Sequence, residues 1–171
     1  MQNKESLSVR QGVSLSSNEA EAVRELHAAI FQPDAQLTLF YCSPSYDRDR
    51  LGAALREAFG NQVIVGCTTA GEIGPTGYTS GGISGVSIAS SELSLICRRM
   101  EHVSTAQMKD GQELAQSMLR SIDPQGKARS AGNLFGFLLI DGMSCKEELV
   151  VASLYREIGR ASCRERVLTD V

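Results

Sequence analysis

The stretch "VIVGCTTAGEIGPTGYTSGG", residues 63–82, decides how this chain folds. It begins with three β-branched residues, as a buried strand does, and then turns to small and hydroxyl-bearing residues around a single acid, Glu72. Open α/β sheets bind ligands where strands end in loops of this kind. The stretch is therefore either a long turn whose glycines serve only the backbone path, or a segment whose main chain lies close to a bound molecule.

Alternating helical and strand patterns surround this stretch. Apolar residues at helical spacing and continuous apolar runs distinguish the two kinds of element. Ser16 and Glu19 have the spacing of a capping box, which predicts the start of the first helix. The predicted strands are 5–13, 35–42, 62–67, 81–90, 92–100 and 134–141, and the predicted helices are 17–31, 46–59, 105–122 and 144–159, with a loop at 123–133.

This order predicts an α/β fold, a mixed β-sheet with helices packed on both faces. Strands that are apolar on both sides are typical of sheets covered by helices on each face. The strands predicted at 81–90 and 92–100 meet at the pair Ser90-Ser91, which suggests a hairpin and argues against a purely parallel sheet.

Composition excludes several classes of protein. The chain has 171 residues, of which 42% are hydrophobic and 22% charged, as in a globular protein. Its net charge of −3 argues against nucleic acid as a partner. No apolar run approaches the ~20 residues of a membrane helix, and the amino terminus lacks a signal-peptide core. We therefore expect a cytoplasmic protein with no membrane partner, whose five cysteines are reduced thiols.

The last residues do not share the pattern of the rest. Residues 159–171 have neither a helical face nor strand alternation, and "EIGRASCRERV" is similar to a sequencing-adaptor tail. We expect one domain over residues 1–158, incomplete at its carboxyl end, and a non-native tail over 159–171. The alternative is a genuine flexible terminus.

Two clusters contain candidate binding residues. In the first cluster, within residues 66–82, glycine permits close approach of the backbone to a ligand, threonine hydroxyls donate and accept hydrogen bonds, and Glu72 brings a negative charge. No phosphate-loop or dinucleotide-binding pattern is present. In the second, "IDGMSCKEE", Asp141 turns the chain, Ser144 could cap a helix together with Glu147, and Cys145 would lie in the first helical turn. A small anion could bind there, or the junction could be purely structural.

The residues for catalysis or metal binding are sparse. The cysteine and histidine spacing fits no structural zinc site. Cys67 or Cys145 with His27 or His102 could form a nucleophile and base, yet such histidines are more often surface residues or satisfied by neighbours. We therefore expect neither an enzyme nor a resident metal.

Taken together, "VIVGCTTAGEI", the Gly-rich segment and "FLLIDGMS" before a helix resemble the FIST amino-terminal domain, from about Leu37 to about Glu157. The resemblance implies a ligand-sensing module in bacterial signal transduction, with small ligands such as amino acids. It also implies a following carboxy-terminal FIST domain that this sequence lacks, and a histidine kinase or other signalling protein as partner. The implied pocket candidates are Gly66, Cys67, Thr68, Thr69, Gly71, Glu72, Asp141 and Ser144.

The same resemblance raises an alternative, a haem-binding nitric-oxide sensor. Its axial ligand would be His27, His102 or a cysteine such as Cys67. In the leading hypothesis the chain has no cofactor and no chemistry of its own. Backbone N–H groups and threonine hydroxyls would then hold the ligand's carboxylate, and Glu72 would hold its ammonium group. A thiol-dependent enzyme and a ligand-free scaffold are the further alternatives.

Overall fold

The computed structural model describes residues 7–75, 77–130 and 133–158. Contacts within the chain divide it into two compact units, residues 1–95 and residues 96–171, and each is described by itself. The tail predicted at 159–171 lies outside the described residues, and the single domain over residues 1–158 stays a prediction.

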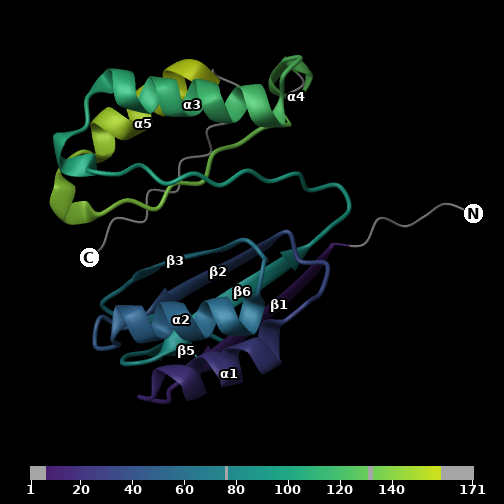
Figure 1. Cartoon of the computed structure of the whole chain (residues 1–171), viewed down its shortest axis with the longest axis vertical. Helices are drawn as coiled ribbons and strands as arrows, with labels where there is room; N and C mark the ends of the chain where they lie inside the picture. Colours follow the sequence, from purple (N-terminus) through teal and green to yellow (C-terminus); the bar gives the residue numbers. More distant parts are fainter. Residues whose placement is uncertain (1–6, 76, 131–132, 159–171) are drawn as a thin grey trace, which may run out of the picture. The chain divides into compact units, whose positions relative to one another are not determined.

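The first unit contains a four-stranded sheet in the order β1-β6-β2-β3. Its strands are β1 (Ser8–Ser14), β2 (Leu37–Cys42), β3 (Ile64–Thr68) and β6 (Ile83–Ala89), and its helices are α1 (Glu19–Ile30) and α2 (Arg48–Phe59). β2 and β3 are parallel, whereas β6 runs antiparallel to both β1 and β2. The predicted α/β fold with a mixed sheet is confirmed (Figure 1).

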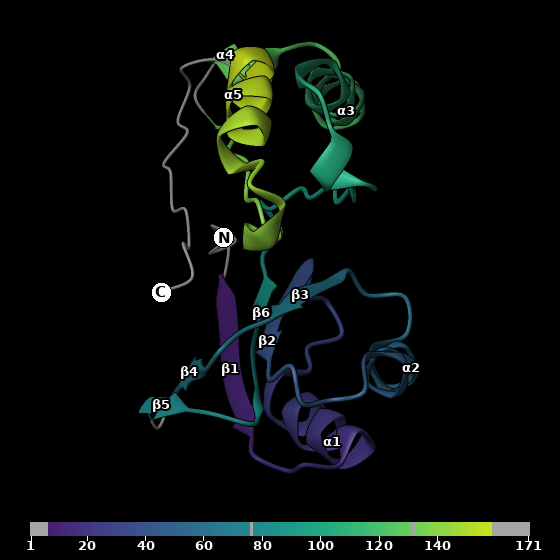
Figure 2. The same cartoon turned by 90° about the vertical axis from the view of Figure 1, so that its left-hand side faces the viewer.

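Both helices of this unit cover the same face of the sheet. The buried core joins Val23, Leu26 and Ile30 of α1 to Leu55 of α2 and Ile83 of β6. Figure 2 shows α1 and α2 on one side of the sheet, and a short two-stranded hairpin, β4 (Glu72–Gly74) and β5 (Gly77–Thr79), on the other. The expected helical covering is therefore present on one face, and on the other face the first unit places the hairpin.

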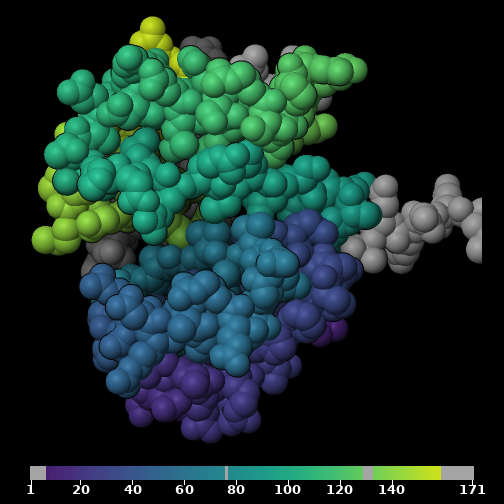
Figure 3. Space-filling view, viewed as in Figure 1, coloured from purple at the N-terminus to yellow at the C-terminus, as the bar shows by residue number. Residues whose placement is uncertain are grey.

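We call the side with the hairpin the open face. Side chains alternate along a strand, so the strand register assigns residues to each face. On the open face, Tyr41 of β2 is opposite Ser84 of β6. Val86 of β6 lies between Leu39 of β2 and Gln11 of β1. In the view of Figure 3 the residues in and around α2, coloured blue, lie at the front of the first unit.

The beginning of α1 differs from the prediction. Asn18 is the N-cap, and its side-chain oxygen accepts a hydrogen bond from the Glu21 N–H at 3.0 Å. The capping box predicted from Ser16 and Glu19 is wrong, because Ser16 lies two residues before the cap and instead accepts from the Asn18 N–H. α2 begins after Asp47, whose side chain accepts from two N–H groups of the first turn.

Two predicted strands do not form among the described residues. The prediction of a strand at 92–100, paired with the preceding strand, is wrong because β6 already has a neighbour on each side, β1 and β2. The prediction of a strand at 134–141 is also wrong. Its Phe135 side chain is 67% exposed, and the run has no strand of its own unit to pair with.

The second unit is helical where it is described. It contains η1 (Val103–Thr105), α3 (Met108–Ile122), α4 (Lys127–Ser130), η2 (Gly142–Ser144) and α5 (Glu147–Ile158). α3 and α5 pack closely through small residues, because a methyl group at Gly111 would overlap the Ser153 side chain of α5. The predicted helix at 105–122 begins at Met108, and the predicted loop at 123–133 contains α4.

Candidate functional site

The Gly-rich segment folds back over the sheet instead of forming an open loop. It leaves the sheet at the end of β3, forms β4 and β5, and returns to the sheet in β6. Gly66 sits against β2, where an added Cβ would lie 2.4 Å from the Phe40 carbonyl oxygen. Gly71 lies beneath the Tyr78 ring, whose hydroxyl oxygen would be 2.2 Å from an added Cβ. Packing against the backbone of β2 therefore requires glycine at position 66, whereas the exposed Tyr78 side chain could move away from a side chain at position 71.

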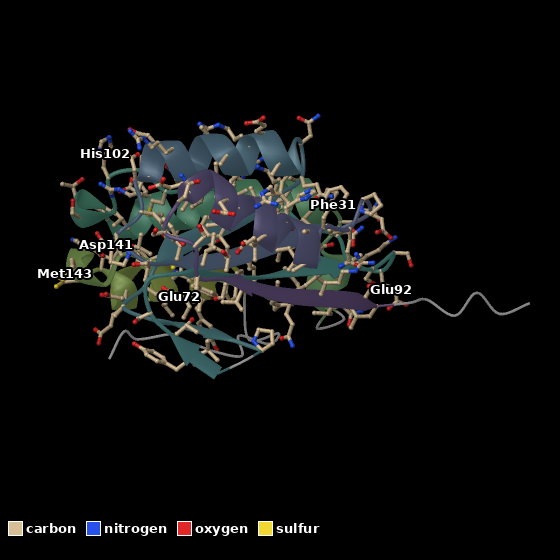
Figure 4. All side chains as sticks on the ribbon, turned by 90° about the horizontal axis from the view of Figure 1, so that it is seen from below. Phe31, Glu72, Glu92, His102, Asp141 and Met143 are labelled. Atoms are coloured by element: carbon tan, nitrogen blue, oxygen red, sulfur yellow. The ribbon has the colours of Figure 1, made fainter. Side chains whose placement is uncertain are left out.

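Glu72 fixes the base of the hairpin (Figure 4). Its side chain is 1% exposed. Oε1 accepts a hydrogen bond from the Thr69 hydroxyl at 3.0 Å, and Oε2 accepts one from the Gly82 N–H at 3.4 Å. The Thr79 hydroxyl donates to the Glu72 carbonyl oxygen at 3.4 Å. The side chain thus ties the start of the hairpin to the residues on either side of it.

The remaining candidates of the segment lie around the end of β3. Cys67 is partly buried on the open face, opposite Tyr41 in the parallel register. Thr68 is exposed at the last position of the strand. The Thr69 N–H donates to the Cys42 carbonyl oxygen at 2.9 Å, which continues the pairing of β2 with the chain beyond β3. The six candidates from Gly66 to Glu72 therefore extend from the end of β3, through the connection at Thr69 and Gly71, to the start of β4.

A hollow of ≈ 120 Å³ lies between this hairpin and the open face. Its roof is the hairpin at Ile73, Gly74 and Pro75, and its floor is formed by strands β1, β2 and β6. Three polar side chains line it, Gln11 from β1, Tyr41 from β2 and Ser84 from β6. Burial raises the pKa of the Tyr41 hydroxyl, and the neighbouring Cys67 adds to the effect.

The second cluster of candidates belongs to the other unit. The Asp141 side chain is exposed and accepts from the Met143 N–H at 2.9 Å, so it caps the short η2 turn. The prediction that Ser144 caps the last helix is wrong: α5 begins at Glu147, and Cys145 between them has a left-handed backbone, with φ of 53°. The Ser144 hydroxyl is buried with no hydrogen-bond partner among the described residues.

The histidines and the buried thiol have structural surroundings. His27 stacks on Phe31, with ring centroids 4.4 Å apart, and meets the edge of Phe59 at 5.0 Å. His102 belongs to the other unit and has a left-handed backbone. Burial, helped by Glu72 and Cys67, raises the pKa of Cys42 to about 11, so this thiol keeps its proton near neutral pH.

Neither a metal cluster nor a membrane span was found in the part of the chain that the structure describes. Within residues 7–75, 77–130 and 133–158, His, Cys, Asp and Glu do not gather into a group of three or more that could hold a metal ion. No helix in those ranges is long and apolar enough to cross a membrane.

Sequence reasoning missed the three polar residues of the hollow. Gln11, Tyr41 and Ser84 are 30 and 43 positions apart in the chain, and only the strand order brings them together. The one local signal is Ser84, a hydroxyl within the otherwise apolar start of the strand "ISGVSIA". A polar side chain in a buried strand requires a partner, which could have marked this position.

The fold and this hollow define an α/β domain whose mixed sheet carries a glycine-rich hairpin over one face. Residues 36–163 match the family described as the FIST N domain, which is three quarters of the chain. The chain therefore belongs to the FIST N domain family, a family of sensory domains in signal transduction that are not typically catalytic. None of the curated proteins matches this chain.

Proposed function

We propose that this chain is a small-ligand-binding sensory module of intracellular, bacterial signal transduction, with no chemistry of its own. Membership of a sensory family supports the role. The proposal depends on the hollow between the glycine-rich hairpin and the open face, because this hollow lies directly beside the segment 66–82. Ligand sites are concave and fitted with a few convergent polar groups, and this hollow is lined by three polar side chains.

The hairpin is the element that would report binding. Its strands have three residues each, and they are held at the base by the Glu72 hydrogen bonds and at the tip by Gly77, which has φ of 105°. Such a short hairpin has few contacts to hold one arrangement. A ligand that prefers one position of the hairpin shifts its population, and a partner that contacts the hairpin detects the shift. A histidine kinase or another signalling protein is the partner we propose.

An amino-acid ligand is the first class to test, and the burial of Glu72 makes a clear demand on it. Both carboxyl oxygens of Glu72 already accept hydrogen bonds, one from Thr69 and one from Gly82. An ammonium group at Glu72 would have to replace these donors, since the carboxyl group is almost completely buried. Binding of an amino acid in this way therefore requires the hairpin to open at its base.

A haem ligand makes a different demand on the first unit. His27 lines a hollow of ≈ 400 Å³ between α1 and α2, yet its ring is engaged by Phe31 and Phe59. Coordination by His27 requires the ring to leave that stack. We therefore propose that His27 is not a haem ligand, and a Soret band that disappears on His27→Ala substitution would contradict this point.

Thermal denaturation with a panel of amino acids and uncharged metabolites tests the proposal. A ligand that binds the native state raises its stability by RT ln(1 + [L]/Kd), about 2.7 kcal/mol at a hundredfold excess over Kd. We expect at least one compound to raise the midpoint for the whole chain. We expect Glu72→Gln to reduce that rise and the exposed control Glu92→Gln to leave it unchanged. A panel in which no compound changes the midpoint would contradict a sensory role.

A further inference from the structure

The polar groups of the hollow lack hydrogen-bond partners within the first unit. Ser84 is 4% exposed and lines the hollow, and none of the hydrogen bonds among the described residues involves its hydroxyl. The Tyr41 side chain is half-buried and the Gln11 side chain is exposed, and none of the hydrogen bonds among the described residues involves either polar group. Buried polar groups in folded proteins are nearly always satisfied by protein, water or ligand. The Ser84 hydroxyl opens into the hollow and is therefore available to hydrogen-bond a molecule, water or ligand, that enters it.

The positions of these groups make them usable by one molecule. In the register of the sheet, Tyr41 and Ser84 are direct neighbours on β2 and β6, and Gln11 is opposite Val86, two residues beyond Ser84. Directly opposed residues have Cβ atoms roughly 5 Å apart, and diagonal neighbours roughly 7–8 Å apart. A single small molecule can thus meet a phenol, a hydroxyl and an amide at once.

The rest of the lining is apolar or plain main chain, and it includes no charged residue. The apolar side chains of the floor are Leu39 and Val86, and the hairpin contributes Ile73, Gly74 and Pro75 to the roof. A ligand carboxylate or ammonium placed there would lose its water without gaining an opposite charge, which costs several kcal/mol per ion. The chemistry of the lining therefore selects against charged molecules, free amino acids included.

The volume sets an upper size. A cavity needs about 10–15 Å³ to hold one water molecule, so the hollow of ≈ 120 Å³ accommodates several waters or one small organic molecule. Pockets for drug-sized ligands measure roughly 300–1,000 Å³. The roof closes the hollow with Gly74 and Pro75, whereas the Ile73 side chain is 81% exposed and alternates with Glu72 and Gly74, which face the sheet.

We propose that the hollow beneath the β4–β5 hairpin binds a small, uncharged molecule with hydrogen-bonding groups, held by Ser84, Tyr41 and Gln11 against Leu39 and Val86. This inference rests on the proposed sensory function and names the ligand class of the same segment. The guest hydrogen-bonds the polar groups of the floor, and its contact with the roof at Gly74 and Pro75 couples occupancy to the position of the hairpin.

Titration of the whole, ¹⁵N-labelled chain tests the inference with named probes. The uncharged probes are 2-pyrrolidone, N-methylacetamide and cyclopentanol, and the charged probes are alanine and acetate. We expect uncharged probes to shift the amide signals of β1, β6 and residues 72–79, and the charged probes to leave them unchanged. Ser84→Ala is expected to weaken probe binding about three- to tenfold, the loss of one hydrogen bond. Ser84→Val, which fills the cavity, should abolish it.

Controls separate a failure of this inference from a failure of the proposed function. Ser80→Ala, an exposed serine of the same segment that does not line the hollow, should bind like the wild type. Tyr41→Phe tests the floor independently if the Ser84 variants fold poorly, and unchanged binding in folded Tyr41→Phe and Ser84→Ala would overturn the inference. Stronger shifts with alanine than with 2-pyrrolidone would overturn the uncharged class while leaving a sensor. The absence of shifts with every probe, together with a metabolite panel that changes no midpoint, would overturn both.

Discussion

Replacement of Glu72 is the perturbation whose consequence follows most directly from the structure. Glu72→Ala removes the acceptor of the Thr69 hydroxyl at 3.0 Å and of the Gly82 N–H at 3.4 Å. A buried donor left unsatisfied costs about 1–3 kcal/mol. The longer bond contributes less, so we expect a total loss of about 2–4 kcal/mol in the unfolding free energy of the first unit.

A graded series of variants checks that estimate. Glu72→Gln keeps one oxygen acceptor and presents an amide donor in place of the second, so we expect about half the loss of Glu72→Ala. The exposed Glu92, which lies in the turn after β6, supplies the matched control, and Glu92→Ala should change stability by less than about 0.5 kcal/mol.

Amide hydrogen exchange with urea denaturation provides the assay. Urea unfolding followed by circular dichroism measures the loss for the chain, and exchange at the Gly82 amide reports the hydrogen bond itself. We expect the Gly82 amide to exchange at least tenfold faster in Glu72→Ala, while amides in the centre of β2 change only by the global loss. Equal Gly82 exchange in wild type and Glu72→Ala would refute the assignment of Glu72 as the anchor of the hairpin.

Four further outcomes follow from the structure of the first unit. Gly66→Ala should destabilise the chain strongly or prevent folding, because the added Cβ would overlap the Phe40 carbonyl oxygen. Gly52→Ala, in α2, should instead raise the unfolding free energy by about 0.5–1 kcal/mol, measured by thermal unfolding. Leu26→Ala, at a fully buried position, should cost about 2–5 kcal/mol in urea unfolding. The pKa of the Cys42 thiol is raised from about 9 to about 11 in the folded chain, so the protonated thiol stabilises the fold fully below pH 9 and this stabilisation is lost as the pH rises to about 11. Cys42→Ala should therefore flatten the alkaline decline in unfolding free energy. An unchanged decline in Cys42→Ala would contradict this prediction.

Local sequence patterns predicted most elements of the first unit. The helices at 17–31 and 46–59 and the strands at 35–42, 62–67 and 81–90 all appear within a few residues of their predicted ends. These predictions succeed because apolar periodicity and caps act over a few residues. The cap of α1 shows the limit, since Asn18 and Ser16 both suit the role and only the backbone decides between them.

Strands that depend on distant partners could not be predicted in this way. Residues 92–100 and 134–141 have strand-like composition, but a strand exists only where another strand offers a free edge. β6 inserts between β1 and β2, so a sequence-adjacent hairpin partner is excluded by the strand order. Local composition contains no information about that order.

None of the eight predicted candidate residues lines the hollow, and their role in binding stays a prediction. The segment 66–82 does adjoin a hollow, through Ile73, Gly74 and Pro75. Glu72, which composition marked as a charge for a ligand, is instead buried and used by the fold. Ser84 and Tyr41 escaped prediction because their neighbourhood is created by pairing between strands that lie far apart in sequence.

Hydrogen exchange of the whole chain, measured with and without the best compound of the metabolite panel, tests the central claim most directly. If the hollow beneath the hairpin holds the ligand, saturation should slow exchange in residues 69–82 and in the facing parts of β1, β2 and β6, and Ser84→Val should remove that protection. Saturating binding that leaves exchange in residues 69–82 unchanged would contradict the claim.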